Sequence, residues 1–239
     1  NFCYGYFVLP ESLKPENRRK FTWSRANPVG SLKQLSKYPA LGGLLVSFVL
    51  IYVASHAVQS NWSFFTMYQF HWDEKMVGYS LGIIGLLVGL VQGGLIRFTS
   101  PRLGNEKSVY IGMLLYSVGM GLFALATQSW MMFTFLIPYC LGGIAGPAMQ
   151  AIISGQVPAN EQGEIQGTMS SLMSASAIVG PPLMSSTFYF FTHKEAPFLL
   201  PGAPFILASC IMLLSASIAY FTLRKHRQNL QATAKDLNE

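Results

Sequence analysis

The polar side chains inside the long apolar stretches of this sequence are the residues that could do chemistry. His56 is the one titratable group of the usual kind within these stretches, and Gln59 and Ser63 follow it on the same face of a helix. A polar group inside a membrane is costly and usually faces a bundle interior or a water-filled cavity. Two interpretations of His56 stay open: it lines a cavity, or it makes a hydrogen bond between helices. The candidate cavity residues are His56, Gln59, Trp62, Gln92 and Gln150.

Other kinds of chemistry are excluded by what the apolar stretches lack. No Asp, Glu, Lys or Arg lies in the middle of a complete stretch, although a proton-coupled carrier needs an acid or an equivalent relay inside the membrane. Cys3, Cys140 and Cys210 lie in apolar segments without a CxxC spacing or a nearby histidine. No nucleophile–base pair is recognisable either. We therefore expect no enzyme activity, no metal site and no cofactor.

The composition and the lengths of the apolar stretches indicate a membrane protein. Hydrophobic residues make up 51% of the 239 residues and charged residues 11%, whereas an ordinary soluble domain has about 25% charged residues. Val77 to Ile96 and Ser108 to Ala126 hold no charge, and each has about the 20 residues that a helix needs to cross a bilayer. The polar segment 97–107 between them predicts a tight loop, in which Asn105 caps the second helix.

The same pattern repeats along the chain and predicts an all-α membrane protein, a bundle of six transmembrane helices. In this topology 14 of the 16 Lys and Arg residues lie on one side: seven in 14–37, three in 97–107 and four in 224–235. This bias marks the cytoplasmic side. We therefore expect a multi-pass protein of the cell membrane with both ends in the cytoplasm, and no nucleic-acid partner for the net charge of +6. The predicted spans are 41–58 (helical to about 68), 77–96, 108–126, 130–154, 165–191 and 199–223.

Four segments follow from this topology. Residues 1–9 have the composition of the end of a preceding transmembrane helix. The basic, proline-containing segment 10–38 is expected to be a cytoplasmic linker. Residues 39–223 hold the six helices, and residues 224–239 are expected to form a cytoplasmic tail.

Small residues and prolines mark the helix faces where close packing is expected. In the second span, five glycines recur every three or four residues, which places them on one helix face and lets another helix approach closely. The stripe serves either static packing or surfaces that slide during a conformational change, and its spacing does not separate the two. Pro181 lies on a second stripe of small residues and favours a kink. The five glycines are Gly78, Gly82, Gly85, Gly89 and Gly93.

Several motifs give the sequence a specific resemblance to a known family. It resembles the C-terminal half of a major facilitator superfamily transporter, in the tetracycline-exporter branch of the drug:proton antiporters. The match follows the chain in order, apart from the linker and the tail. The segments that carry it, similar to the family's sixth, eighth, tenth and eleventh helices, are 1–13, 70–81, 142–150 and 162–183.

The polar segment between the second and third spans is similar to the loop motif of this family. Arg102, Gly104 and Lys107 stand where the motif has its basic residues and its second glycine. Arg97 replaces the first glycine and Pro101 replaces the acid. The resemblance therefore implies a degenerate second copy of the motif.

Two further departures from the family bear on the substrate. Tyr116 and Val88 occupy positions at which tetracycline exporters carry an Asp and, in some members, a His. Such groups could help to bind or couple a tetracycline–metal chelate. The resemblance therefore implies an unidentified small amphipathic substrate more than tetracycline itself.

The resemblance also implies an architecture and a function for the whole protein. The chain would be the second six-helix half of a twelve-helix, proton-coupled multidrug or tetracycline-like efflux antiporter that works by alternating access. Its expected partners are an N-terminal six-helix half that holds the proton-coupling acid, the lipid bilayer, the substrate and protons. Two alternatives stay open: a solute importer or facilitator of the same fold, and a non-transporting membrane protein that binds a partner.

Overall fold

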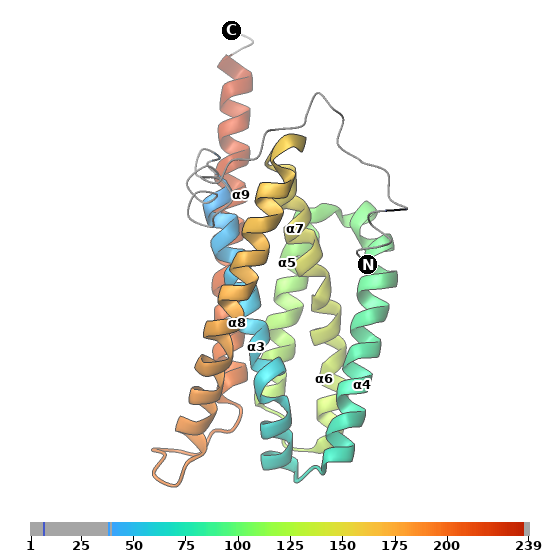
Figure 1. Cartoon of the computed structure of the whole chain (residues 1–239), viewed down its shortest axis with the longest axis vertical. Coiled ribbons are helices and arrows are strands. Elements are labelled where there is room, and N and C mark those ends of the chain that lie inside the picture. The colour runs from blue at the N-terminus through green and yellow to red at the C-terminus, as the bar shows by residue number, and fades with distance from the viewer. Residues whose placement is uncertain (1–6, 8–37, 39, 237–239) are drawn as a thin grey trace.

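The computed structural model describes Phe7, Tyr38 and residues 40 to 236; the predicted segments 1–9 and 10–38 otherwise lie outside the described residues. The described part consists of helices and short turns without a strand, which confirms the predicted all-α fold. Its long helices run side by side along the long axis of the molecule (Figure 1). The elements are α3 (Leu41–Phe70), α4 (Glu74–Leu90), η2 (Val91–Leu95), α5 (Ile96–Ala124), α6 (Ser129–Leu141), η3 (Gly142–Ile144), α7 (Ala145–Gly155), η4 (Ala159–Glu161), α8 (Gln162–Thr192) and α9 (Ala203–Asp236).

Among the described residues, five helical units are long and apolar enough to cross a membrane. The fifth predicted span, 165–191, corresponds to α8, which has 31 residues and therefore sufficient length. Its first half is rich in Ser, Gly and Gln, so it is less apolar than the other spans. The five units are Leu41–Phe70, Glu74–Thr99, Pro101–Ala124, Ser129–Gly155 and Ala203–Gln228.

The chain reverses direction between the second and third spans at a single glycine. The predicted loop 97–107 is wrong in its extent, because α4 continues through the π-helical segment η2 into helical residues 96–103. Gly104 has φ 73° and ψ 165°, a conformation that residues with a side chain avoid. Ser108 Oγ donates a hydrogen bond to the Gly104 carbonyl at 2.7 Å. We call the end of the bundle that carries Gly104 and the last turns of α9 the basic end.

At the opposite end, a connection of three residues joins α3 to α4. His71 takes a left-handed conformation with φ 54° and ends α3. Asp73 then caps α4, because its Oδ1 accepts a hydrogen bond from the Met76 N–H at 2.8 Å. Trp72 ties this connection to the start of α6 by donating from Nε1 to Ser129 Oγ at 2.9 Å. The connection between α3 and α4 is therefore short and tightly held.

Two reciprocal serine pairs join α9 to its neighbours. Ser47 of α3 and Ser215 of α9 each donate from Oγ to the other's backbone carbonyl, at 2.9 and 2.8 Å. Ser117 of α5 and Ser209 of α9 repeat this arrangement at 3.2 and 2.9 Å. Small hydroxyl residues let helix backbones approach closely in a membrane and supply hydrogen bonds without a charge. The pairs therefore position α9 against both α3 and α5.

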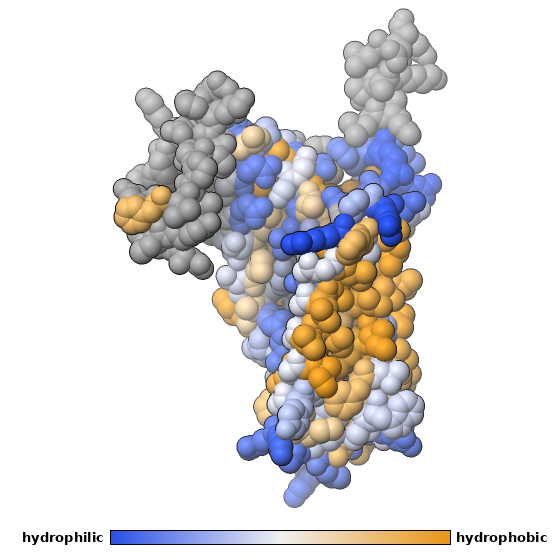
Figure 2. Space-filling view, turned by 90° about the vertical axis from the view of Figure 1, so that its right-hand side faces the viewer, coloured by the Kyte–Doolittle hydropathy of each residue, from blue (hydrophilic) through white to orange (hydrophobic). Residues whose placement is uncertain are grey.

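The side of the bundle formed by α4 is open. A Cβ added at any glycine of the predicted stripe, which runs along α4 and into η2, would have no described atom within 4 Å. Figure 2 shows a broad hydrophobic surface on this side of the molecule, between hydrophilic ends. The stripe is therefore not a packing surface within the described part of the chain. Packing of the stripe against another part of the protein stays a prediction.

Candidate functional site

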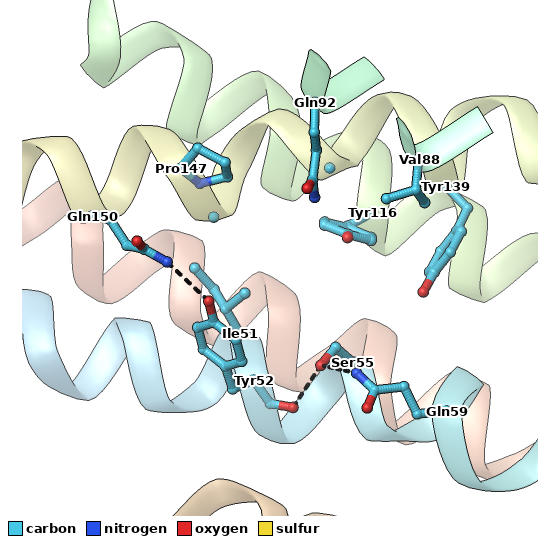
Figure 3. A pocket seen from close by; sticks show the side chains of 12 residues that line it. Ile51, Tyr52, Ser55, Gln59, Val88, Gln92, Tyr116, Tyr139, Pro147 and Gln150 are labelled. Atoms are coloured by element: carbon cyan, nitrogen blue, oxygen red, sulfur yellow. Dashed lines mark hydrogen bonds between the residues drawn. The ribbon is translucent and has the colours of Figure 1, made fainter. Parts of the chain in front are cut away.

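A polar cavity of about 340 Å³ lies between α3, η2, α5 and the α6–α7 unit. This volume falls in the range of small-molecule sites in proteins, about 300–1,000 Å³. Figure 3 shows polar side chains that reach into it from several helices. The cavity is lined by Ile51, Tyr52, Ser55, Gln59, Val88, Gln92, Tyr116, Tyr139, Gly143, Gly146, Pro147 and Gln150.

One wall of the cavity is a face of α3 whose polar groups are hydrogen-bonded along the helix. Tyr52, Ser55 and Gln59 are three and four residues apart and therefore share this face. Ser55 Oγ donates to the Tyr52 carbonyl at 2.8 Å, and Gln59 Nε2 donates to Ser55 Oγ at 3.3 Å. This wall therefore presents hydroxyl and amide groups without a formal charge.

A hydrogen bond connects the α3 wall to α7 across the cavity. Gln150 Nε2 donates to Tyr52 Oη at 3.0 Å, as Figure 3 shows. Gln150 is the central residue of α7 and lies nearer the basic end than Gly146 and Pro147, the other two α7 residues that line the cavity. The bond therefore bounds the cavity on the side of the basic end.

Two departures from regular α-helix meet at this cavity. The π-helical η2 carries Gln92 and the 3₁₀ segment η3 carries Gly143, and these two segments contact each other. Pro147 contributes to the helix break at η3, because it has no N–H to donate to the Gly143 carbonyl. Single π turns inside α-helices occur frequently at functional sites. Here the π turn contributes an amide to the cavity wall.

The glycines at the α6–α7 break bring Tyr116 close to the backbone of this unit. A Cβ at Gly142 would lie 2.7 Å from Tyr116 Cγ, which leaves no room for a side chain. A Cβ at Gly143 would lie 3.8 Å from Gln92 Nε2 and 3.9 Å from Tyr116 Oη. The amide of Gln92 and the phenol of Tyr116 therefore converge beside Gly143.

Tyr139 completes the aromatic part of the cavity. Its ring centroid lies 5.0 Å from that of Tyr116 in an edge-to-face arrangement, and 6% of the residue is exposed. Within the described part of the chain, neither phenol nor the Gln92 amide makes a hydrogen bond to another residue. These three groups are therefore available to a ligand.

The structure brings three of the five predicted cavity residues together. Gln59 lies on the α3 wall, Gln92 in η2 and Gln150 on α7, and all three line the same cavity. They come from segments far apart in the sequence. Their only shared sequence signal is an amide inside an apolar stretch.

The other two predicted residues, His56 and Trp62, lie outside this cavity. His56 is 8% exposed and packs against α8, where a Cβ at Gly180 would overlap its imidazole ring. Its ring makes no hydrogen bond to another described residue, so the contact is one of packing. Trp62 is 1% exposed and donates from Nε1 to Ser80 Oγ at 2.8 Å. Contrary to the cavity prediction, both belong to the core, because α3 has neighbouring helices on several sides.

The sequence interpretation missed the hydroxyl groups of the cavity. Tyr52 and Ser55 share a helix face with the predicted glutamine of α3, and this spacing could have identified them. The sequence marks Tyr116 and Val88 only as departures from a family pattern, yet both line the cavity. Tyr139 lies in an apolar segment and gives no comparable signal.

The residues of the predicted loop motif lie at the basic end, away from the cavity. None of Arg102, Gly104 and Lys107 is among the cavity residues. Glu106, between Gly104 and Lys107, forms an ion pair with Arg227 of α9; the Arg227 side chain is largely exposed and the Glu106 side chain is partly exposed. Among the described residues, no group of three His, Cys, Asp or Glu side chains could hold a metal ion.

A bundle of membrane-length helices around an uncharged polar cavity defines a multi-pass membrane protein with a site of small-molecule size. The chain belongs to the Major Facilitator Superfamily, whose family model matches residues 44–238. Members of this superfamily are transporters and not enzymes.

The proteins similar to this chain include resistance proteins and a transporter. The chain is 31% identical over 188 residues to the class C tetracycline resistance protein of Escherichia coli, covering 79% of this chain and 47% of that protein. It is 40% identical over 141 residues to the class E protein of Escherichia coli, covering 59% and 35%. The crystal structure of the human organic anion transporter MFSD10 (TETRAN) has the same fold, with a TM-score of 0.74 and 21% identity, over 91% of this chain and 53% of that one. The chain thus spans about half the length of these proteins or less.

Proposed function

We propose that this chain is the C-terminal half of a secondary active transporter, a proton-coupled efflux antiporter for small amphipathic compounds. The observation that carries the proposal is the uncharged polar cavity between α3, η2, α5 and α7, in a chain of the Major Facilitator Superfamily. The tetracycline resistance proteins among its relatives support an exporter of amphipathic compounds.

In this proposal the cavity is one wall of the substrate site. Gln59, Gln92 and Gln150 offer amide donors and acceptors to a substrate that lies between the two halves of the whole protein. The halves rock about this site, so that it opens to one side of the membrane and then to the other. The basic end is the cytoplasmic end, in keeping with the positive-inside bias.

The proton-coupling acid belongs to the other half of the protein in this proposal. No Asp, Glu, Lys or Arg lines the cavity among the described residues. Proton relays in membrane transporters are built from ionisable side chains. This half therefore contributes groups that hydrogen-bond to the substrate. The other half contributes the ionisable side chain that takes up and releases the proton.

The N-terminal six-helix half is the proposed partner for the open faces of α4 and α8. The glycine stripe of α4 and the positions Gly163 and Gly167 of α8 have no described atom near their Cβ positions. Gly faces of this kind let a helix of another subunit or half approach to backbone contact. The second small-residue stripe, which includes Pro181, continues along α8.

Transport by purified protein tests this proposal. The full-length protein that contains this chain is reconstituted into liposomes, and the flux of a fluorescent amphipathic dye is measured with and without an imposed pH gradient. We expect gradient-driven flux from the full-length protein and none from residues 1–239 alone. Dye flux that is the same with and without the pH gradient would indicate a facilitator. Dye flux in the same direction as the proton would indicate an importer.

A further inference from the structure

A second cavity lies between α3 and α8 and is lined by apolar residues. In Figure 1, α8 crosses α3 obliquely, and the two helices meet where a Cβ added at Gly180 would overlap the ring of His56. Toward the basic end from this contact, they leave a cavity of about 370 Å³. None of its lining side chains offers a hydrogen bond to a ligand. These residues are Gly42, Leu45, Val46, Val49, Leu50 and Leu172.

This apolar cavity faces away from the polar cavity and from the glycine face of α8. A helix turns by about 100° per residue, so Val46 of the apolar cavity lies about 140° around α3 from Gln59 of the polar cavity. On α8, Leu172 lies about 180° around the helix from Gly163, which belongs to the face proposed for the N-terminal half. The side that remains for the apolar cavity is the one that faces membrane lipid.

The length and depth of the apolar cavity match one leaflet of a bilayer. Gly42 to Leu50 span about 12 Å along α3, close to half of the hydrocarbon core of about 30 Å. Within this span Val46 is 51% exposed. An acyl chain in the leaflet at the basic end therefore has both the length and the apolar surface to fill this cavity.

A cation lies at the end of the cavity that meets the membrane surface. Thr222 of α9 packs against Gly43 of α3, and Lys225 follows about one helical turn nearer the basic end. Lys225 is about 160° around α9 from Ser209, which bonds to α5, so it lies on the side of α9 away from α5. Lys225 is exposed and has no ion-pair partner in the described part of the chain.

The apolar surface continues on α9 below this cation. Leu214, Phe221 and Lys225 are separated by seven and four residues and therefore share a helix face. Leu214 is 54% exposed and Phe221 is 66% exposed. This face therefore offers a second apolar track that ends at the same cation.

We propose that α3, α8 and α9 bind one anionic phospholipid of the leaflet at the basic end. One acyl chain fills the apolar cavity, the second lies along Leu214 and Phe221, and the headgroup pairs with Lys225. Basic residues beside membrane helices attract anionic headgroups. A second copy of this chain would instead bring its own basic end to the same depth of the membrane, where like charges repel. The site goes beyond the proposed function and does not depend on the compound that is transported.

Retention of defined lipids by the full-length protein tests this proposal. The protein is mixed in detergent with phosphatidylglycerol or with zwitterionic phosphatidylcholine that has the same acyl chains, and native mass spectrometry counts the lipids and subunits. We expect one phosphatidylglycerol to bind about fivefold more tightly than phosphatidylcholine. Equal binding of the two lipids would overturn the proposal. A dimer that retains no lipid would make a second copy the occupant and would also overturn it.

Removal of the charge tests the position of the headgroup. Lys225→Gln should weaken binding of phosphatidylglycerol about fivefold and leave phosphatidylcholine unchanged, because one cation near the membrane surface is lost. Lys107→Gln is the matched control, because Lys107 is exposed at the same end, lies on α5 and has no ion-pair partner among the described residues. An unchanged preference for phosphatidylglycerol in Lys225→Gln would overturn the proposal.

Filling the apolar cavity tests the position of the acyl chain. Gly42→Leu and Val46→Trp place larger side chains in the cavity, since a Cβ at Gly42 has no atom within 4 Å and Val46 is half exposed. Each should weaken binding of both lipids at least about fivefold, because several methylene groups lose their contact with the protein. Leu114→Trp, on an exposed face of α5 outside the cavity, is the control. Size-exclusion chromatography selects the folded variants, and unchanged lipid binding in either folded cavity variant would overturn the proposal.

Discussion

The consecutive helices α4 and α5 use glycine in opposite ways. On α5, a Cβ at Gly119 would lie 2.7 Å from the backbone nitrogen of Tyr139, and one at Gly112 would lie 2.8 Å from the backbone nitrogen of Ala145. On α4, the striped glycines have no described atom within 4 Å of a Cβ. Accordingly, 44% of the apolar window of Pro101–Ala124 is buried, but only 6% of that of Glu74–Thr99.

This difference shows what a glycine pattern does and does not predict. Regular spacing predicts a face on which another backbone can approach. It does not say whether that backbone belongs to the same half of the protein. The space beside Gly112 and Gly119 of α5 is occupied by the α6–α7 unit. In contrast, no described atom lies beside the glycines of α4. The following predictions test this comparison, from the largest expected effect to the smallest.

Leucine on α5 should prevent folding. In Gly119→Leu the new side chain would overlap the backbone of Tyr139. Even a few extra methylenes in a packed core cost about 1–3 kcal/mol, and here the backbone itself would have to move. We expect no folded full-length protein by fluorescence-detected size-exclusion chromatography. A monodisperse Gly119→Leu peak at the wild-type position would contradict the close packing of α5.

Leucine on α4 should spare folding of this half and impair transport by the whole protein. A Cβ at Gly85 or Gly89 would have no described atom within 4 Å, and the leucine side chains of Gly85→Leu and Gly89→Leu would occupy the face that we propose for the N-terminal half. We expect protein that accumulates and shows at least about a tenfold loss of gradient-driven flux, in contrast to Lys75→Ala in the first turn of α4. Normal export by both leucine variants would mean that this face contacts lipid.

Removal of the His56 ring should lower stability without changing the substrates. His56 packs against Gly180 of α8 and lies outside the cavity. His56→Ala should therefore reduce the free energy of unfolding by about 0.5–3 kcal/mol, the usual range for a buried substitution. The measurements are the thermal midpoint and the relative export of several dyes. A changed substrate profile at wild-type stability would support the alternative that His56 lines a transport cavity.

Removal of one serine pair should have the smallest effect. A double-mutant cycle with Ser47→Ala and Ser215→Ala measures the coupling between α3 and α9. Interhelical hydrogen bonds in membranes contribute about 0.6 kcal/mol on average and up to about 1.7 kcal/mol. Ser217→Ala is the control, because its Oγ bonds to the Leu213 carbonyl within α9. Zero coupling would mean that the pair only permits close approach.

The sequence predicted the helices well because long uncharged stretches leave few alternatives in a membrane. It also identified three glutamines that the structure brings to one cavity. Amides are recognisable inside apolar helices, whereas Tyr52 and Tyr139 resemble the aromatic residues that fill helix cores. Periodicity assigns a residue to a helix face but not to a neighbour. For this reason it did not separate Gln59, which lines the cavity, from His56, which packs against α8.

Irregular helical segments account for the remaining differences. The prediction of a loop over 97–107 rested on the assumption that the helix ends where the charged residues begin. In the structure the helix continues to Gly104, where the chain reverses. Gly93 belongs to η2, where the α-helical period no longer applies. Gly142 and Gly143 are adjacent in sequence, and only their three-dimensional neighbours show that one is closely packed and the other open.

The π turn of η2 makes this part of the chain sensitive to its length. A π-helical hydrogen bond spans one residue more than an α-helical bond, so η2 accommodates one residue that a regular helix would not. Deletion of Gly94 would let the helix become regular and rotate the residues up to Gly104 by about 100° about its axis. The reversal would then send α5 toward a different side of the bundle. In a sequence alignment, a one-residue gap within 91–95 would therefore indicate that the following helix leaves in a different direction. It would not indicate a shorter loop.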